Sequence, residues 1–116
     1  MLIRVLSFWL LTTSAISAAD WPQHLGPSRT GHSAEKELIE AWPANGLKTV
    51  WKVPGGVGMS GIAVQDALAI TLIQKAGNQY AVALDAQTGQ TKWETSVGPE
   101  YTNAMGNGPR AFPALA

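Results

Sequence analysis

From residue 47 onward, hydrophobic and polar positions alternate with a period of two, the pattern of β-strands with one side facing a core. Clusters of Gly, Asn, Asp and Gln interrupt this alternation and indicate turns. The pattern predicts strands over residues 47–53, 61–64, 67–73, 79–84 and 90–97. Because short turns join consecutive strands only when they run antiparallel, we expect an all-β antiparallel meander.

Two central strands carry large and small side chains on opposite sides. The large side chains of strand 79–84 share one side: Tyr80, Val82 and Leu84. Strand 67–73 is apolar on both sides, so we expect it in the middle of a covered sheet. Strand 90–97 alternates Thr91, Trp93 and Thr95 with Lys92, Glu94 and Ser96, as a partly solvated edge does. We therefore expect a sheet with one large and one small face, which would stack as blades of a β-propeller do.

Residues 1–19 have the order of a secretory signal peptide. One early positive charge, Arg4, precedes a short apolar run, and small residues lead up to Ala19. The run is shorter than the roughly 20 residues that span a bilayer, although an uncleaved anchor is an alternative. Cleavage after Ala19 predicts a secreted or periplasmic chain with no stable membrane span. The next segment, 20–46, is rich in Gly and Pro and predicts extended or turning chain, with at most one or two helical turns at 34–41.

Composition narrows the classes of function. The 116 residues contain 8 basic and 8 acidic side chains, so the formal net charge is zero. A nucleic-acid binder that neutralises phosphates needs an excess of Lys and Arg, and we therefore expect no nucleic-acid partner. The chain has no cysteine, which excludes disulfides, thiolate metal sites and a lipid-modified cysteine anchor.

One turn between predicted strands carries a motif with a physical basis. Asp85 can accept backbone N–H groups across the turn, Thr88 can hydrogen-bond locally, and Gly89 can adopt the left-handed conformation. Trp93 then lies on the sheet surface as a large plug. The motif, A-x-D-x-x-T-G-x-x-x-W, resembles the repeat of pyrroloquinoline-quinone (PQQ)-like β-propellers. The structural repeat residues are Asp85, Thr88, Gly89 and Trp93.

Residues 21–31 are similar to the opening signature W-P-Q-x-x-G-P-x-R-x-G of a secreted subgroup of this family, which includes BamB-like and quinoprotein-like members. The resemblance implies a ring-closing strand at 47–53, a first four-stranded blade at 60–97 and the start of a truncated second blade at 98–116. A complete propeller of this kind would have 7 to 8 blades. Because a single repeat cannot cover its own apolar faces, the expected partners are downstream blades of the same propeller, or another protein.

Other candidate chemistry has competing interpretations. Residues 56–61 match G-x-G-x-x-G, and Asp85 follows at a suitable distance, so a dinucleotide site is an alternative if a helix begins at Gly61. His24 and His32 could ligate a metal only with further ligands nearby. Arg29 and Arg110 could bond to carbonyl or carboxylate groups at blade junctions or line a central opening. No residue is singled out as catalytic, cofactor-binding or metal-binding.

The resemblance implies an exported, non-catalytic scaffold that binds other proteins. The alternative is the N-terminal piece of a quinoprotein dehydrogenase, an oxidoreductase in which PQQ and calcium lie on the propeller axis. The motifs that hold those cofactors belong to later blades, and none maps onto these residues. PQQ and calcium would therefore concern only a longer protein.

Overall fold

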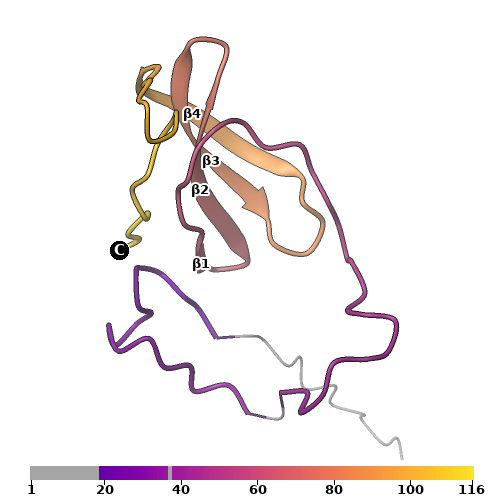
Figure 1. Cartoon of the computed structure of the whole chain (residues 1–116). Helices are drawn as coiled ribbons and strands as arrows, with labels where there is room; N and C mark the ends of the chain where they lie inside the picture. The colour runs from indigo at the N-terminus through magenta and orange to yellow at the C-terminus, as the bar shows by residue number, and fades with distance from the viewer. Residues whose placement is uncertain (1–18, 37) are drawn as a thin grey trace, which may run out of the picture.

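The computed structural model describes residues 19–36 and 38–116, and it contains one four-stranded antiparallel sheet (Figure 1). The predicted signal peptide therefore lies outside the described residues, except for Ala19. The strands pair in chain order and are β1 (Ala63–Gln65), β2 (Leu68–Lys75), β3 (Asn78–Asp85) and β4 (Thr91–Pro99). The chain is thus an all-β protein, as the alternation predicts. The helical turns expected at 34–41 do not form in the described part of that segment, where Leu38 and Trp42 are exposed and provide no packing for a helix.

Two tight turns fix the pairing of the first three strands. Asp66 and Ala67 join β1 to β2, and Ala76 and Gly77 join β2 to β3; all four residues have positive φ. A two-residue hairpin turn with positive φ at both positions matches the right-handed twist of the strands it joins. Lys75 therefore pairs with Asn78, and this pair sets the register along the whole length of β2 and β3.

The register corrects the expectation of one large and one small face. Ile70 pairs with Ala83, and Ala69 pairs with Leu84. Partners in an antiparallel pair point to the same side, so most large residues of β2 share a face with the small residues of β3. Ile73, which pairs with Tyr80, is the exception. On one side, the Ile70 face, these residues are Leu68, Ile70, Leu72, Ala81 and Ala83. On the other, the Leu84 face, they are Ala69, Thr71, Ile73, Tyr80, Val82 and Leu84.

The described residues bury few apolar side chains. The buried hydrophobic residues are Ala63, Ala69, Val82 and Ala83, and no large side chain is fully buried. Ala83 is completely covered because Ile70 and Trp93 flank it on the two neighbouring strands. Apart from Val82, the large residues of β2 and β3 are only half-buried. Both faces of the sheet thus keep apolar surface in contact with solvent.

Two extended segments pair with the sheet through single residues, one with β1 and one with the end of β2. Trp21 exchanges two backbone hydrogen bonds with Val64 at 2.8 and 3.0 Å, and Val57 exchanges two with Gln74 at 2.9 and 2.7 Å. Residues 51–57 therefore run from the β3–β4 turn to the far end of β2. Residues 47–53, expected as a strand, pair with no described segment. Their predicted partner lies in a later blade, so that pairing stays a prediction.

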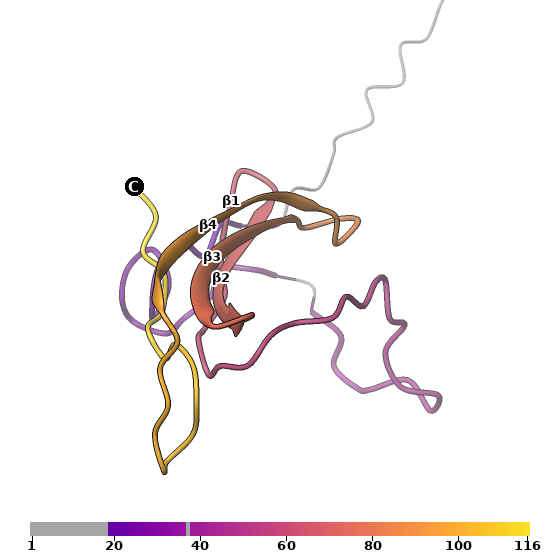
Figure 2. The same cartoon turned by 90° about the horizontal axis from the view of Figure 1, so that it is seen from above.

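The chain leaves the sheet through a long loop and returns to its first edge. Figure 2 shows the loop over residues 100–110 projecting from the end of the sheet. Pro109 then accepts a hydrogen bond from the Met59 amide at 2.8 Å, and the Leu115 amide donates to Pro22 at 2.9 Å. The described residues include no helix that could span a membrane.

Candidate functional site

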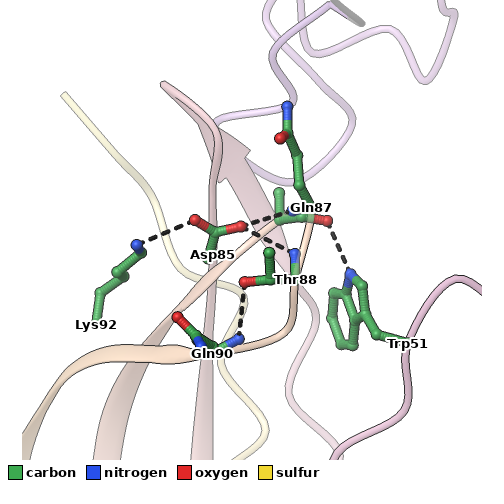
Figure 3. Close-up of polar contacts among 7 residues, drawn as sticks. Trp51, Asp85, Gln87, Thr88, Gln90 and Lys92 are labelled. Carbon is green, nitrogen blue, oxygen red and sulfur yellow. Dashed lines mark hydrogen bonds and ion pairs between the residues drawn. The ribbon is translucent and has the colours of Figure 1, made fainter.

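The β3–β4 turn is held by the carboxylate of Asp85 (Figure 3). One oxygen, Oδ1, accepts the backbone N–H groups of Gln87 at 3.0 Å and Thr88 at 2.9 Å. The Thr88 hydroxyl accepts the Gln90 amide at 3.3 Å, and the Gly89 amide donates to the Asp85 carbonyl at 2.8 Å. These are the local hydrogen bonds that the spacing of the motif predicts.

The second oxygen of Asp85, Oδ2, lies 3.1 Å from the ammonium group of Lys92 on β4. This ion pair and the amides of the turn lower the pKa of Asp85 from its ordinary value of 3.8 to about 2, with Lys92 as the largest cause. The carboxylate is therefore ionised at all physiological pH values. A permanently ionised, fully hydrogen-bonded carboxylate holds a turn well and has no proton to exchange near neutral pH.

Gly89 is required for two reasons. Its φ is +74°, in the left-handed region that favours glycine, and it is packed against the indole ring of Trp51. A Cβ added at Gly89 would lie 2.7 Å from a ring carbon of Trp51 and 3.1 Å from Val53. The Trp51 Nε1–H donates to the Ala86 carbonyl at 2.9 Å (Figure 3). The turn thereby anchors the start of the segment that runs along the sheet.

Trp93, the last residue of the motif, lies on β4 opposite Ala83. Its side chain belongs to the Ile70 face and is 42% exposed. The structure thus places the indole on the sheet surface, as the sequence predicts. Its role as a plug between adjacent blades stays a prediction, because only one sheet is described.

The signature residues 21–31 form a compact loop beside β1. Gly26, with a φ of +78°, is buried under Trp21, so that a Cβ there would lie 2.7 Å from the indole. The Gln23 side chain donates to the Pro27 carbonyl at 3.3 Å and accepts the Arg29 Nε–H at 3.1 Å. The Gly31 amide, at a φ of +73°, donates to Leu25 at 2.9 Å. Most of the signature is therefore explained by the shape of this loop.

The C-terminal segment packs onto the same region. The Ser60 hydroxyl donates to the Ala111 carbonyl, and the Phe112 ring covers Gly61 so closely that a Cβ there would overlap it. The ring also meets His24 edge to face, with 5.6 Å between centroids. Where the loop and the segment meet, they border an open hollow of about 260 Å³. Its lining residues are Gln23, His24, Leu25, Arg29, Phe112 and Ala114.

Several sequence candidates do not come together. No helix begins at Gly61, because the following residues enter β1, so the dinucleotide interpretation of residues 56–61 is wrong. Gly56 instead lies directly against the Gln74 backbone. His24 and His32 have no third ligand, and the described residues contain no cluster of three His, Cys, Asp or Glu side chains. Arg110 donates to the Gly106 carbonyl and lies 5.3 Å from the centre of the Tyr101 ring.

Sequence reasoning missed three contacts that position these elements. They are the pairing of Trp21 with Val64, the hydrogen bond from Trp51 to Ala86, and the hydrogen bond from the Tyr101 amide to the buried Gln74 side chain at 2.7 Å. A Gln directly after the apolar run 67–73 was the one local signal for the last contact. The first two join residues 35 or more positions apart, which no local pattern reveals.

Comparison with protein-family models, with curated proteins and with solved structures gave no match for this chain. The class of protein that the fold defines is therefore a small all-β protein built on one antiparallel meander sheet.

Proposed function

We propose that this chain supplies the first blade of an exported PQQ-like β-propeller that acts as a non-catalytic scaffold for other proteins. The observation that carries the proposal is the apolar surface on both faces of the sheet, where no large side chain is fully buried. Full burial of a side chain such as Ile70 or Leu84 stabilises a fold by roughly 1.5 to 3 kcal/mol. A sheet of this kind is most stable between two others, which is the position of a propeller blade.

The distribution of large and small side chains over the two faces supports the stacking of one such sheet on another. On the Ile70 face the large residues of β2 form a ridge beside a trough over β3, where Ala81 and Ala83 lie. On the Leu84 face the ridge lies over β3 and the trough over β2, at Ala69 and Thr71, and the trough ends at Ile73. When the Ile70 face of one such sheet is laid on the Leu84 face of another, with equivalent strands superposed, each ridge meets a trough. Close packing of this type is what protein interiors require.

The course of the C-terminal segment also supports the proposal. After β4 the chain returns to the first edge of the sheet, beside β1. There Ala114 and Leu115 lie near Leu68 and Ile70 around a hollow of about 350 Å³. A following blade would begin at this place, against the Ile70 face. The ion pair and amides around the Asp85 carboxylate fit the structural turn of such a repeat.

The test of the blade uses the full-length exported protein. The change Ile70→Lys places a charge on the proposed interface, and Gln87→Lys places the same charge at an exposed position of the β3–β4 turn, outside both faces. If a neighbouring sheet covers the Ile70 face, Ile70→Lys lowers the free energy of unfolding by about 3 kcal/mol or more, because a buried charge has no partner. Gln87→Lys changes it by less than about 0.5 kcal/mol. Equal, small effects would show that the face is open and would remove the proposal.

The scaffold role is tested separately by titration with PQQ. We expect no saturable binding of PQQ to the full-length protein, with or without calcium. Saturable, calcium-dependent binding would overturn the non-catalytic role and favour the dehydrogenase, while leaving the blade intact.

A further inference from the structure

The hollow between the signature loop and the C-terminal segment is not used by the proposed blade. Its lining joins residues from 23–29 with Phe112 and Ala114, which are more than 80 positions later in the chain. We propose that it binds a carboxylate carried by a small apolar group. This site goes beyond the scaffold role and does not depend on it.

Charge is the first argument for this ligand. The described residues that line the hollow include the guanidinium of Arg29 and the imidazole of His24, and none of them is acidic. A guanidinium presents several N–H donors in one plane, which matches the two oxygens of a carboxylate. The imidazole of His24 adds a second group that can donate a hydrogen bond.

Orientation of the guanidinium is the second argument. Gln23 accepts the Arg29 Nε–H at 3.1 Å, and the same Gln23 side chain is itself fixed by its hydrogen bond to Pro27. Arg29 has a φ of +53°, a left-handed conformation that residues with a side chain adopt rarely. The rest of the loop holds it there, because the Arg29 amide donates to the Gly26 carbonyl at 3.1 Å. The signature loop thus orients this cation before any ligand arrives.

The apolar part of the lining selects the body of the ligand. Leu25, Phe112 and Ala114 contribute apolar surface, and the edge-to-face contact with His24 holds the Phe112 ring in place. A volume of about 260 Å³ accommodates a small ring or a short branched chain together with its carboxylate. A hydrated inorganic phosphate would leave the apolar surface without a partner.

The experiment uses 4-fluorobenzoate as the probe and follows its ¹⁹F NMR signal during titration with the full-length protein. Because the hollow is open to solvent, we expect a dissociation constant on the order of 1 mM. Arg29→Gln raises this constant at least about tenfold, since a charged hydrogen-bonding partner is lost. Lys48→Gln removes the same charge from an exposed position away from the hollow and leaves the constant unchanged.

Further probes and a second variant keep the proposal open to refutation. Gln23→Glu puts a carboxylate against Arg29 and is expected to weaken binding of the probe. This second variant provides the test if Arg29→Gln fails to fold. Neutral 4-fluorobenzyl alcohol is expected not to bind, and inorganic phosphate is expected not to displace the probe at equal concentration. Absence of benzoate binding at 10 mM, roughly ten times the expected constant, would overturn the proposal. So would undiminished binding to the variants, equal binding of the alcohol, or displacement by phosphate.

Discussion

Gly89→Ala is expected to be among the most destabilising single changes in the β3–β4 turn. An alanine there must adopt the left-handed conformation, at a φ of +74°, which costs about 1 kcal/mol. Its Cβ would lie 2.7 and 2.8 Å from two ring carbons of Trp51, closer than carbon atoms approach, so the indole must move. If the ring moves, its hydrogen bond to the Ala86 carbonyl is lost, at a further cost of about 1 kcal/mol. The total loss is therefore roughly 2 to 3 kcal/mol.

Gly77→Ala is the matched control for this change. Gly77 has nearly the same φ, +77°, and nothing lies within 4 Å of its added Cβ. It therefore isolates the conformational cost, about 1 kcal/mol. Urea unfolding of the full-length protein, followed by circular dichroism, measures both variants. We expect Gly89→Ala to lose at least about 1 kcal/mol more than Gly77→Ala.

The double variant Trp51→Ala, Gly89→Ala completes the experiment. If the two residues are in contact, the loss caused by Trp51→Ala is smaller in the Gly89→Ala background, with a coupling of about 1 kcal/mol. Equal losses from the two glycine variants, together with additive effects of Trp51→Ala and Gly89→Ala, would refute the packing of the turn on Trp51.

Three further outcomes are expected. The pKa of Asp85 is lowered to about 2 in the folded chain, so its ionised form stabilises the fold. This contribution is present above about pH 4 and is lost as pH falls through about 2. Unfolding measured between about pH 2 and 6 is expected to show this loss in the unchanged protein and not in Asp85→Asn. Gly61→Ala forces the Phe112 ring to move and lowers the free energy of unfolding by about 1 to 3 kcal/mol. In a Phe112→Ala background the same change is expected to have a much smaller effect. An equal loss in that background would contradict the contact between Gly61 and Phe112. N-terminal sequencing of the exported protein is expected to begin at Asp20, and a chain that retains residues 1–19 would contradict the signal peptide.

Most of the sheet could be predicted from local sequence patterns. The alternation and the turn residues placed all four strands within two residues of their observed ends, because side-chain period and turn chemistry act over a few positions. The hydrogen bonds of Asp85 followed from the spacing of its motif for the same reason. The face assignment was wrong because it depends on which residues pair across the Ala76–Gly77 turn, and a shift of one residue exchanges the faces.

Long-range contacts set the rest of the site. The signature at 21–31 was visible in the sequence, but the partner of Arg29 in its loop and the approach of Phe112 were not. These contacts depend on the path of the C-terminal segment, which passes Ser60 and Gly61 before it reaches His24. No periodicity encodes such a path.

The ridge and trough that each face of the sheet carries have a consequence for assembly and for evolution, if the sheets stack as proposed. A surface that fits the reverse side of its own copy makes a head-to-tail contact, which either closes into a ring or continues without limit. Tandem duplication of the coding segment would supply each new unit with a ready-made neighbour, so the ring could grow without any new interface being invented. Separate copies of a sheet that stacks in the proposed way are expected to form open filaments in preference to symmetric dimers.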